Sequence, residues 1–141
     1  MRRFAMLIAA AALLTGTTVR AAELDVKEGM YEVTIKTVMP GMPMPDQTVR
    51  DCVTAADRKD PQRIMKKGGG GDDCALKDYK QESNRISFAI SCPKEQVNGK
   101  GEYRFSGDGY AGTMKMTMAA PGAPPMSMDV QTTAKWVGPC K

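Results

Sequence analysis

The strongest constraint on the fold of this chain is the spacing of its apolar residues, which recur at every second position. In the segment MYEVTIKTV (30–38), Tyr31, Val33 and Ile35 fall on one side, and polar residues alternate with them. Successive side chains of a β-strand point to opposite faces, so this spacing predicts a strand with one buried and one solvent-facing side. The same alternation continues along most of the chain, which indicates a mainly β protein.

Further segments with strand spacing follow, and turn-forming residues separate them. Ser83-Asn84, Asn98-Gly99 and the SGDG sequence at 106–109 predict tight turns. The predicted strands are 30–38, 48–53, 74–80, 86–92, 101–105, 110–118 and 126–136. An antiparallel meander of about seven such strands forms a curled sheet or a small up-and-down barrel.

One short helix, broken near its middle, is predicted after the second strand. Thr54 and Asp57 fit a capping box, in which each residue satisfies the backbone N–H of the other. Asp60-Pro61 fits a second helix start, and the glycine run at 68–71 predicts the end.

The C-terminal segment MKMTMAAPGAPPMSM (114–128) concentrates five methionines at alternate positions on two short runs. Folding it as a hairpin about Gly122 places Met118 opposite Met126 and Met116 opposite Met128. The even positions from Tyr110 to Trp136 are mostly apolar and the odd ones mostly polar. We therefore expect the methionines to share the inner face of the sheet.

The first 21 residues have the layout of an export signal. Arg2 and Arg3 precede a short apolar stretch at 4–14, and Val19-Arg20-Ala21 fits a cleavage site. Cleavage after Ala21 would leave residues 22–141 as a single domain without a membrane span. The formal charge of +4 would fall to +1, because three arginines leave with the signal. With no basic patch remaining, nucleic-acid binding is not expected.

Four cysteines, Cys52, Cys74, Cys92 and Cys140, lie in the predicted exported part. An oxidising compartment favours two structural disulfides over a metal site or a redox pair, because the spacing matches neither. The sequence between Cys74 and Cys92 is nearly symmetric about Ser83-Asn84, so a hairpin sets these two cysteines opposite each other. The preferred pairing is therefore 74–92 with 52–140, although four cysteines permit three pairings.

Several segments together resemble an exported bacterial family of unknown function, known as domain of unknown function 3617. They are EGMYEVTIKTVMPGMPMPDQTVRDCVT (28–54), GGGGDDC (68–74), GDGYAGTMKMTM (107–118) and the terminal Cys140. The resemblance covers essentially the whole mature chain. It implies a small β-rich, disulfide-bonded domain in the periplasm of a Gram-negative bacterium, or secreted, with no assigned activity and no functional residues to transfer.

Composition argues against an enzyme, because the chain contains no histidine. Histidine-dependent triads and histidine zinc sites are excluded, and no nucleophile has a visible base. The acidic residues near the glycine run do not follow the spacing of a calcium loop, and the run lacks the ending of a phosphate-binding loop. We therefore expect a non-enzymatic protein without a cofactor.

Three interpretations of the methionines remain open. In the first, they are adaptable core filler in a structural or envelope interaction protein. In the second, they line a site for an apolar or amphipathic ligand, such as a lipid or hydrophobic small molecule. In the third, they bind Cu(I), which soft thioether sulfurs select, and the loop residues Met39, Met42 and Met44 are best placed for this. The residues predicted for the ligand site are Met39, Met42, Met44, Met114, Met116, Met118, Met126, Met128 and Trp136.

Overall fold

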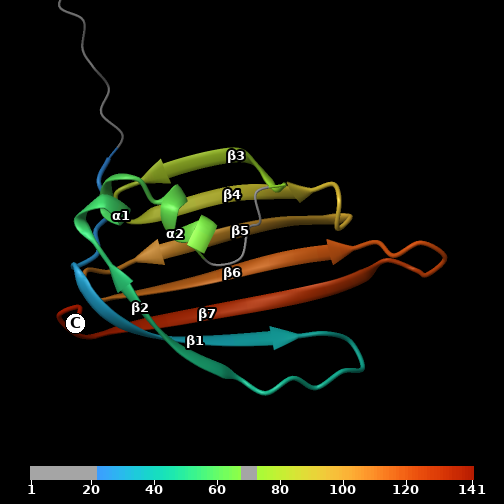
Figure 1. Cartoon of the computed structure of the whole chain (residues 1–141), viewed down its shortest axis with the longest axis horizontal. Coiled ribbons are helices and arrows are strands. Elements are labelled where there is room, and N and C mark those ends of the chain that lie inside the picture. The colour runs from blue at the N-terminus through green and yellow to red at the C-terminus, as the bar shows by residue number, and fades with distance from the viewer. Residues whose placement is uncertain (1–21, 68–72) are drawn as a thin grey trace, which may run out of the picture.

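The computed structural model describes residues 22–67 and 73–141 and shows one seven-stranded antiparallel sheet (Figure 1). The predicted export signal and the glycine run at 68–71 lie outside the described residues. The sheet order is β2-β1-β7-β6-β5-β4-β3. The strands are β1 (Gly29–Val38), β2 (Gln47–Val53), β3 (Ala75–Glu82), β4 (Arg85–Cys92), β5 (Val97–Phe105), β6 (Gly109–Met118) and β7 (Met126–Gly138).

The pairing follows the chain, except that β1 lies between β2 and β7. Within the β6–β7 hairpin, Met118 pairs with Met126 and Met116 with Met128, which confirms the predicted register. Strands β2 and β3 are the two edges, so the sheet is open and curled and is not a closed barrel. The predicted mainly β meander is confirmed.

The predicted turn at Asn98-Gly99 is wrong, because both residues lie inside β5. Gly99 pairs with Ile90 of β4 and Met116 of β6. A Cβ atom there would lie 3.0 Å from the Met116 Cγ atom and 3.3 Å from Ile90 Cγ1. Glycine at this position therefore makes room for neighbouring side chains, and the reversal occurs earlier, at residues 93–96.

Two short helices, α1 (Ala55–Lys59) and α2 (Gln62–Lys67), connect β2 toward β3. The predicted capping box is present: the Thr54 N–H donates to Asp57 Oδ2 at 2.9 Å, and Thr54 Oγ1 accepts from the Asp57 N–H. The Asp57 side chain is fully buried. The helical segment is broken at Asp60-Pro61, as predicted. No helix in the described part of the chain has the length and apolarity needed to cross a bilayer.

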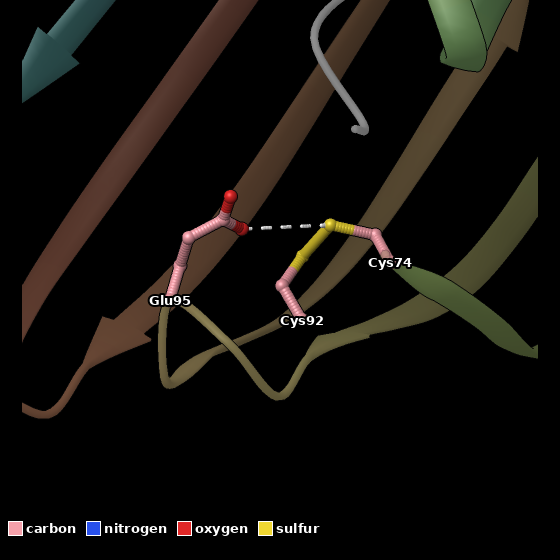
Figure 2. Close-up of side chains that lie close together, drawn as sticks. All are labelled: Cys74, Cys92 and Glu95. Atoms are coloured by element: carbon pink, nitrogen blue, oxygen red, sulfur yellow. Dashed lines mark hydrogen bonds between the residues drawn. A yellow bond between two sulfur atoms is a disulfide. The ribbon is translucent and has the colours of Figure 1, made fainter. Parts of the chain in front are cut away.

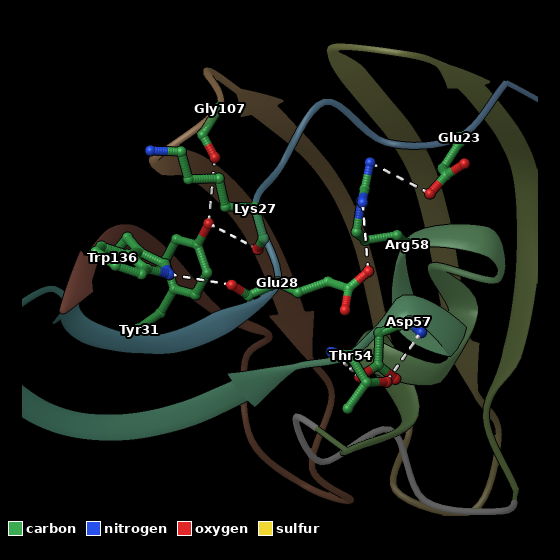
Figure 3. Close-up of polar contacts among 9 residues, drawn as sticks. All are labelled: Glu23, Lys27, Glu28, Tyr31, Thr54, Asp57, Arg58, Gly107 and Trp136. Carbon is green, nitrogen blue, oxygen red and sulfur yellow. Dashed lines mark hydrogen bonds and ion pairs between the residues drawn. The ribbon is translucent and has the colours of Figure 1, made fainter. Parts of the chain in front are cut away.

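The segment before β1 closes one end of the curled sheet. Leu24 and Val26 are almost completely buried, and the Lys27 N–H donates to the Gly107 carbonyl at 2.7 Å. The Tyr31 hydroxyl lies 3.0 Å from the Lys27 carbonyl oxygen and 3.3 Å from that of Gly107 (Figure 3). We call this end of the molecule the closed end.

An arginine of α1 fixes the helix against the segment that closes this end. The Arg58 guanidinium lies 3.2 Å from Glu23 and 3.5 Å from Glu28 (Figure 3). The Leu24 N–H also donates to the Arg58 carbonyl oxygen at 3.3 Å. The helical connection is therefore attached to the N-terminal segment by both charge and backbone contacts.

Two disulfides join Cys52 to Cys140 and Cys74 to Cys92, the pairing that hairpin symmetry favours. The first links β2 to the tail beyond β7, and β1 lies between these two strands. The second closes the far end of the β3–β4 hairpin. Two disulfides fit an oxidising compartment.

Candidate ligand cavity

The inner face of the curled sheet surrounds a cavity of about 740 Å³. Side chains from six strands line it, and Pro61 and Ile64 at α2 contribute on the side of the helical connection. This volume is within the range of sites that hold small molecules. The apolar lining comprises Val33, Ile35, Val49, Ile64, Ile86, Phe88, Ile90, Val97, Phe105, Met114, Met116, Met118 and Val130.

A cluster of aromatic rings forms the floor of the cavity toward the closed end. Tyr110 is at its centre: its ring centroid lies 5.6 Å from that of Tyr31 and 5.7 Å from that of Phe105. Tyr103 lies 6.3 Å from Tyr110 and stacks against Phe88 at 6.1 Å. Aromatic rings at these separations attract one another, so the rings hold each other in place on the floor of the cavity.

Two glycines allow the rings to lie flat on the sheet. A Cβ atom at Gly112 would be 2.2 Å from the Tyr103 ring, and one at Gly101 would be 2.7 Å from the Phe88 ring. Any larger residue would push these rings into the space above. The glycines of β5 and β6 therefore keep the cavity open at its floor.

The polar groups in the lining are few. Arg50 and Asp51 contribute from β2, Glu95 from the β4–β5 turn and Thr132 from β7, together with the hydroxyls of Tyr103 and Tyr110. Burial raises the pKa of Tyr110 above its ordinary value near 10, and the negative charge of Asp51 raises it further. Tyr110 therefore presents a neutral hydroxyl beside a carboxylate, which suits a ligand with a small polar end.

The raised Tyr110 pKa predicts a loss of stability in alkali. In the unfolded chain the phenol ionises near pH 10, whereas the folded protein retains the proton to higher pH. The unfolded state then binds fewer protons than the folded state, so the free energy of unfolding falls as pH rises above 10. We expect Tyr110→Phe to make the free energy of unfolding fall less steeply with pH in this range, measured by urea unfolding at several alkaline pH values. An unchanged slope would show that Tyr110 does not contribute.

The structure brings some of the predicted site residues together. Met114, Met116 and Met118 line the cavity along β6 and are half-buried. Met126 lines a neighbouring groove of about 240 Å³ at the β6–β7 hairpin tip. Met128 pairs with Met116 across the hairpin but does not contribute to the cavity lining.

The other predicted residues lie elsewhere. Of the described residues that line the cavity, none comes from the loop at 39–45, so Met39, Met42 and Met44 lie outside it. The Met42 N–H donates to the Met39 carbonyl, and this local turn leaves Met42 exposed. The loop at 39–45 contributes no side chain that covers the cavity.

Trp136 also lies outside the cavity, at the closed end. Trp136 pairs with Tyr31 and Gly138 with Met30, so Val137 is an extra residue that disrupts the alternation immediately after Trp136. The Trp136 indole N–H donates to the Glu28 carbonyl at 3.1 Å, and the Lys27 ammonium lies 5.4 Å from the ring centroid (Figure 3). Its ring anchors the closing segment.

Phe88, Tyr103 and Phe105 lie at alternate positions of two predicted strands, but they are absent from the residues predicted for the ligand site. The prediction also missed Arg50, Asp51 and Ile64, which come from the edge strand and the helical connection. The alternation of residues in the central strands was a sufficient signal for the aromatic floor. No comparable pattern identifies the edge residues, because they reach the cavity only through the curl of the sheet.

Within the described part of the chain, one group of cysteine and acidic side chains lies close enough to hold a metal ion. It comprises Cys74, Cys92 and Glu95, whose ligand atoms lie within 4.8 Å of one another. Figure 2 shows the two sulfurs joined to each other, with Glu95 Oε2 3.9 Å from Cys74 Sγ. A disulfide sulfur has no thiolate to offer, so in this state the group supplies only one carboxylate.

Comparison with known proteins gives a family. The family model described as protein of unknown function (DUF3617) matches residues 26–140. The chain belongs to the DUF3617 family. The match includes all seven strands and both disulfides of this DUF3617 protein. No curated protein and no solved structure matches the chain.

Proposed function

We propose that this DUF3617 protein is a non-catalytic binding protein for an apolar or amphipathic ligand, held in the cavity of the curled sheet. The observation that supports this is an apolar cavity of about 740 Å³ in a domain of this size. Methionines in a filled core pack closely against other side chains, whereas Met114, Met116 and Met118 line a cavity. Unbranched thioethers can adapt to the shape of different hydrocarbon chains.

The surroundings of the cavity specify the ligand further. The aromatic floor and the aliphatic side chains offer a long apolar contact, and Asp51 acts on Tyr110 to give one polar point in the lining, whereas the Arg50 guanidinium is exposed and pairs with Glu32 at 3.8 Å. A ligand with one hydrocarbon part and one small polar part, such as a fatty acid or a related lipid, fits this distribution. We place the protein in the periplasm, with the export signal cleaved after Ala21. The two disulfides support an oxidising compartment.

Native mass spectrometry of protein taken gently from the producing cells tests the proposal directly. We expect a mass increment that disappears on organic extraction and is recovered in the extract. The same spectrum gives the mass of the processed chain, which identifies the cleavage site. Absence of any increment, combined with no uptake of fatty acid by the extracted protein, would contradict the proposal.

A paired substitution locates the ligand. Met116→Trp with Val130→Trp adds two large rings to the inner face, and we expect dansyl-undecanoic acid to bind about tenfold more weakly or not at all. The matched control shifts both changes by one residue, to Thr117→Trp with Gln131→Trp, whose side chains are exposed. The control should bind as the wild type does. Dye fluorescence and displacement by oleic acid provide the measurement, and equal loss in both variants would place the ligand outside the cavity.

The Cu(I) interpretation remains a prediction. The exposed position of Met42 makes it accessible to an ion, but the structure adds no further observation in its favour. The cavity methionines face apolar space and share it with aromatic rings, an arrangement that favours hydrocarbon contact.

A further inference from the structure

The end of the sheet opposite the closed end presents two uncharged loops. The first, at 39–45, connects β1 to β2, and the second, at 119–125, is the tip of the β6–β7 hairpin. They lie at the same end, because β1 pairs with β7 up to the Val38–Asp129 pair, near the start of β7 (Figure 1). We call these two loops, together with the flanking residues Val38 and Met126, the apolar tips.

The apolar tips expose hydrocarbon to solvent. Val38, Met42, Met44 and Met126 account for four of the seven large apolar side chains that are exposed in the described residues. No charged residue occurs between Lys36 and Asp46, or between Lys115 and Asp129. Proline, alanine, glycine and methionine make up most of both loops. A group of exposed apolar side chains gathered at one end, in contrast to single scattered ones, is typical of an interaction site.

The charged residues that flank the two loops are balanced. One lysine and one aspartate flank each loop, and Lys115 lies directly opposite Asp129 in the β6–β7 register. The third turn at this end, 93–96, carries Lys94 and Glu95, and Lys94 pairs with Asp73 at 2.7 Å, so this turn has no basic excess. Uncharged tips without an excess of basic residues behind them match a bilayer of zwitterionic lipids rather than an anionic surface.

The apolar tips are also continuous with the cavity. Glu95 and Met118 line both the cavity and the groove at the hairpin tip, so the two hollows meet at these residues. The groove continues along Ala119, Ala123 and Met126 to the exposed tip. An apolar chain leaving the cavity by this route would remain in contact with apolar side chains until it reached the tips.

We propose that the apolar tips dock the protein on the surface of a zwitterionic lipid bilayer, so that an amphipathic ligand passes along the groove between bilayer and cavity. The transfer step rests on the proposed function, whereas the docking step can be measured alone. Docking inserts the exposed methionines among the headgroups and involves no net charge attraction. Binding to vesicles is therefore expected to depend little on salt or on anionic lipid.

Flotation with phosphatidylcholine and phosphatidylethanolamine vesicles tests the docking step. The protein is produced with its own N-terminal segment, and its mass after processing is determined first. Met42→Glu with Pro121→Glu puts a charge on each tip, and we expect vesicle binding to fall about tenfold or more. The control Val137→Glu changes a similarly exposed apolar residue at the closed end and should leave binding unchanged. If the glutamate pair fails to fold, the neutral pair Met42→Gln with Pro121→Ser replaces it, with a smaller expected loss.

The outcomes separate docking from ligand binding. Three results would overturn the docking surface: no binding of the wild type to zwitterionic vesicles, binding only when anionic phosphatidylglycerol is present, or equal binding by the variant with both tips charged. A protein partner would then be the occupant to seek. Uptake of dansyl-undecanoic acid from solution should be unchanged in the tip variants. Protein that binds vesicles through its tips but takes up no fatty acid would overturn the proposed function and leave docking intact.

Discussion

Replacing Cys52 and Cys140 with serine is expected to lower the free energy of unfolding by about 4 to 5 kcal/mol, a large share of the stability of a domain this small. The two cysteines are 88 residues apart, so the disulfide removes much conformational freedom from the unfolded chain. It also holds the edge strand β2 beside the tail that follows β7. Urea unfolding under non-reducing conditions gives the difference.

The second disulfide provides the comparison. Cys74 and Cys92 are 18 residues apart, so serine at both positions should cost about 3 kcal/mol, less than the long-range pair. Hydrogen exchange should show the first variant losing protection mainly in β2 and the second mainly in β3. A larger loss from the short-range pair would contradict the loop-length explanation.

Gly29→Ala is expected to destabilise the protein by about 3 kcal/mol or more. The Gly29 φ of +142° is a conformation that residues with a side chain rarely adopt. A Cβ atom there would lie 2.2 Å from the Trp136 indole nitrogen and 2.5 Å from the Gly138 carbonyl oxygen. The substitution therefore strains the backbone and displaces the ring that anchors the closing segment, which should also shift Trp136 fluorescence.

Gly122→Ala is the matched control for this effect. Gly122 also has a positive φ, +76°, but a Cβ atom there would have nothing within 4 Å. Only the backbone cost of about 1 to 2 kcal/mol should remain. Equal losses in the two variants would show that close contact at Gly29 is unimportant.

The strands and their register were predictable, because the face on which each side chain lies follows from alternation alone. Met116 and Met118 were placed opposite Met128 and Met126 by the position of Gly122, and the structure has these pairs. Turn chemistry was less reliable. Asn98-Gly99 has the composition of a hairpin turn, yet Gly99 lies inside β5, where a Cβ atom would be in tight contact with Met116 and Ile90.

The candidate site was predictable only in part. Alternation shows that Met114 points inward, but it does not show whether the inside is filled or hollow. That depends on how far the sheet curls and on α2, whose contribution through Ile64 has no pattern in the sequence. Trp136 shows the other limit: it keeps the alternation and pairs with Tyr31, yet it lies at the closed end, where its indole N–H donates to the Glu28 carbonyl. The closing segment that it anchors has no pattern in the sequence.

The two unpaired edges of the sheet have a consequence for the range of ligands. In a closed barrel every strand is hydrogen-bonded on both sides, so the number of strands largely sets the diameter of the barrel. Here a seam separates β2 from β3. At the closed end the helical connection crosses it, and the segment before β1 also binds across it, since the Asp25 N–H donates to the Ser83 carbonyl and the Gln81 side chain donates to the Ala22 carbonyl. Away from that end, the seam can widen or narrow without breaking a backbone hydrogen bond within the sheet. For the proposed binding function, this would let one chain accept ligands of different thickness, with selection among them at the residues of the mouth.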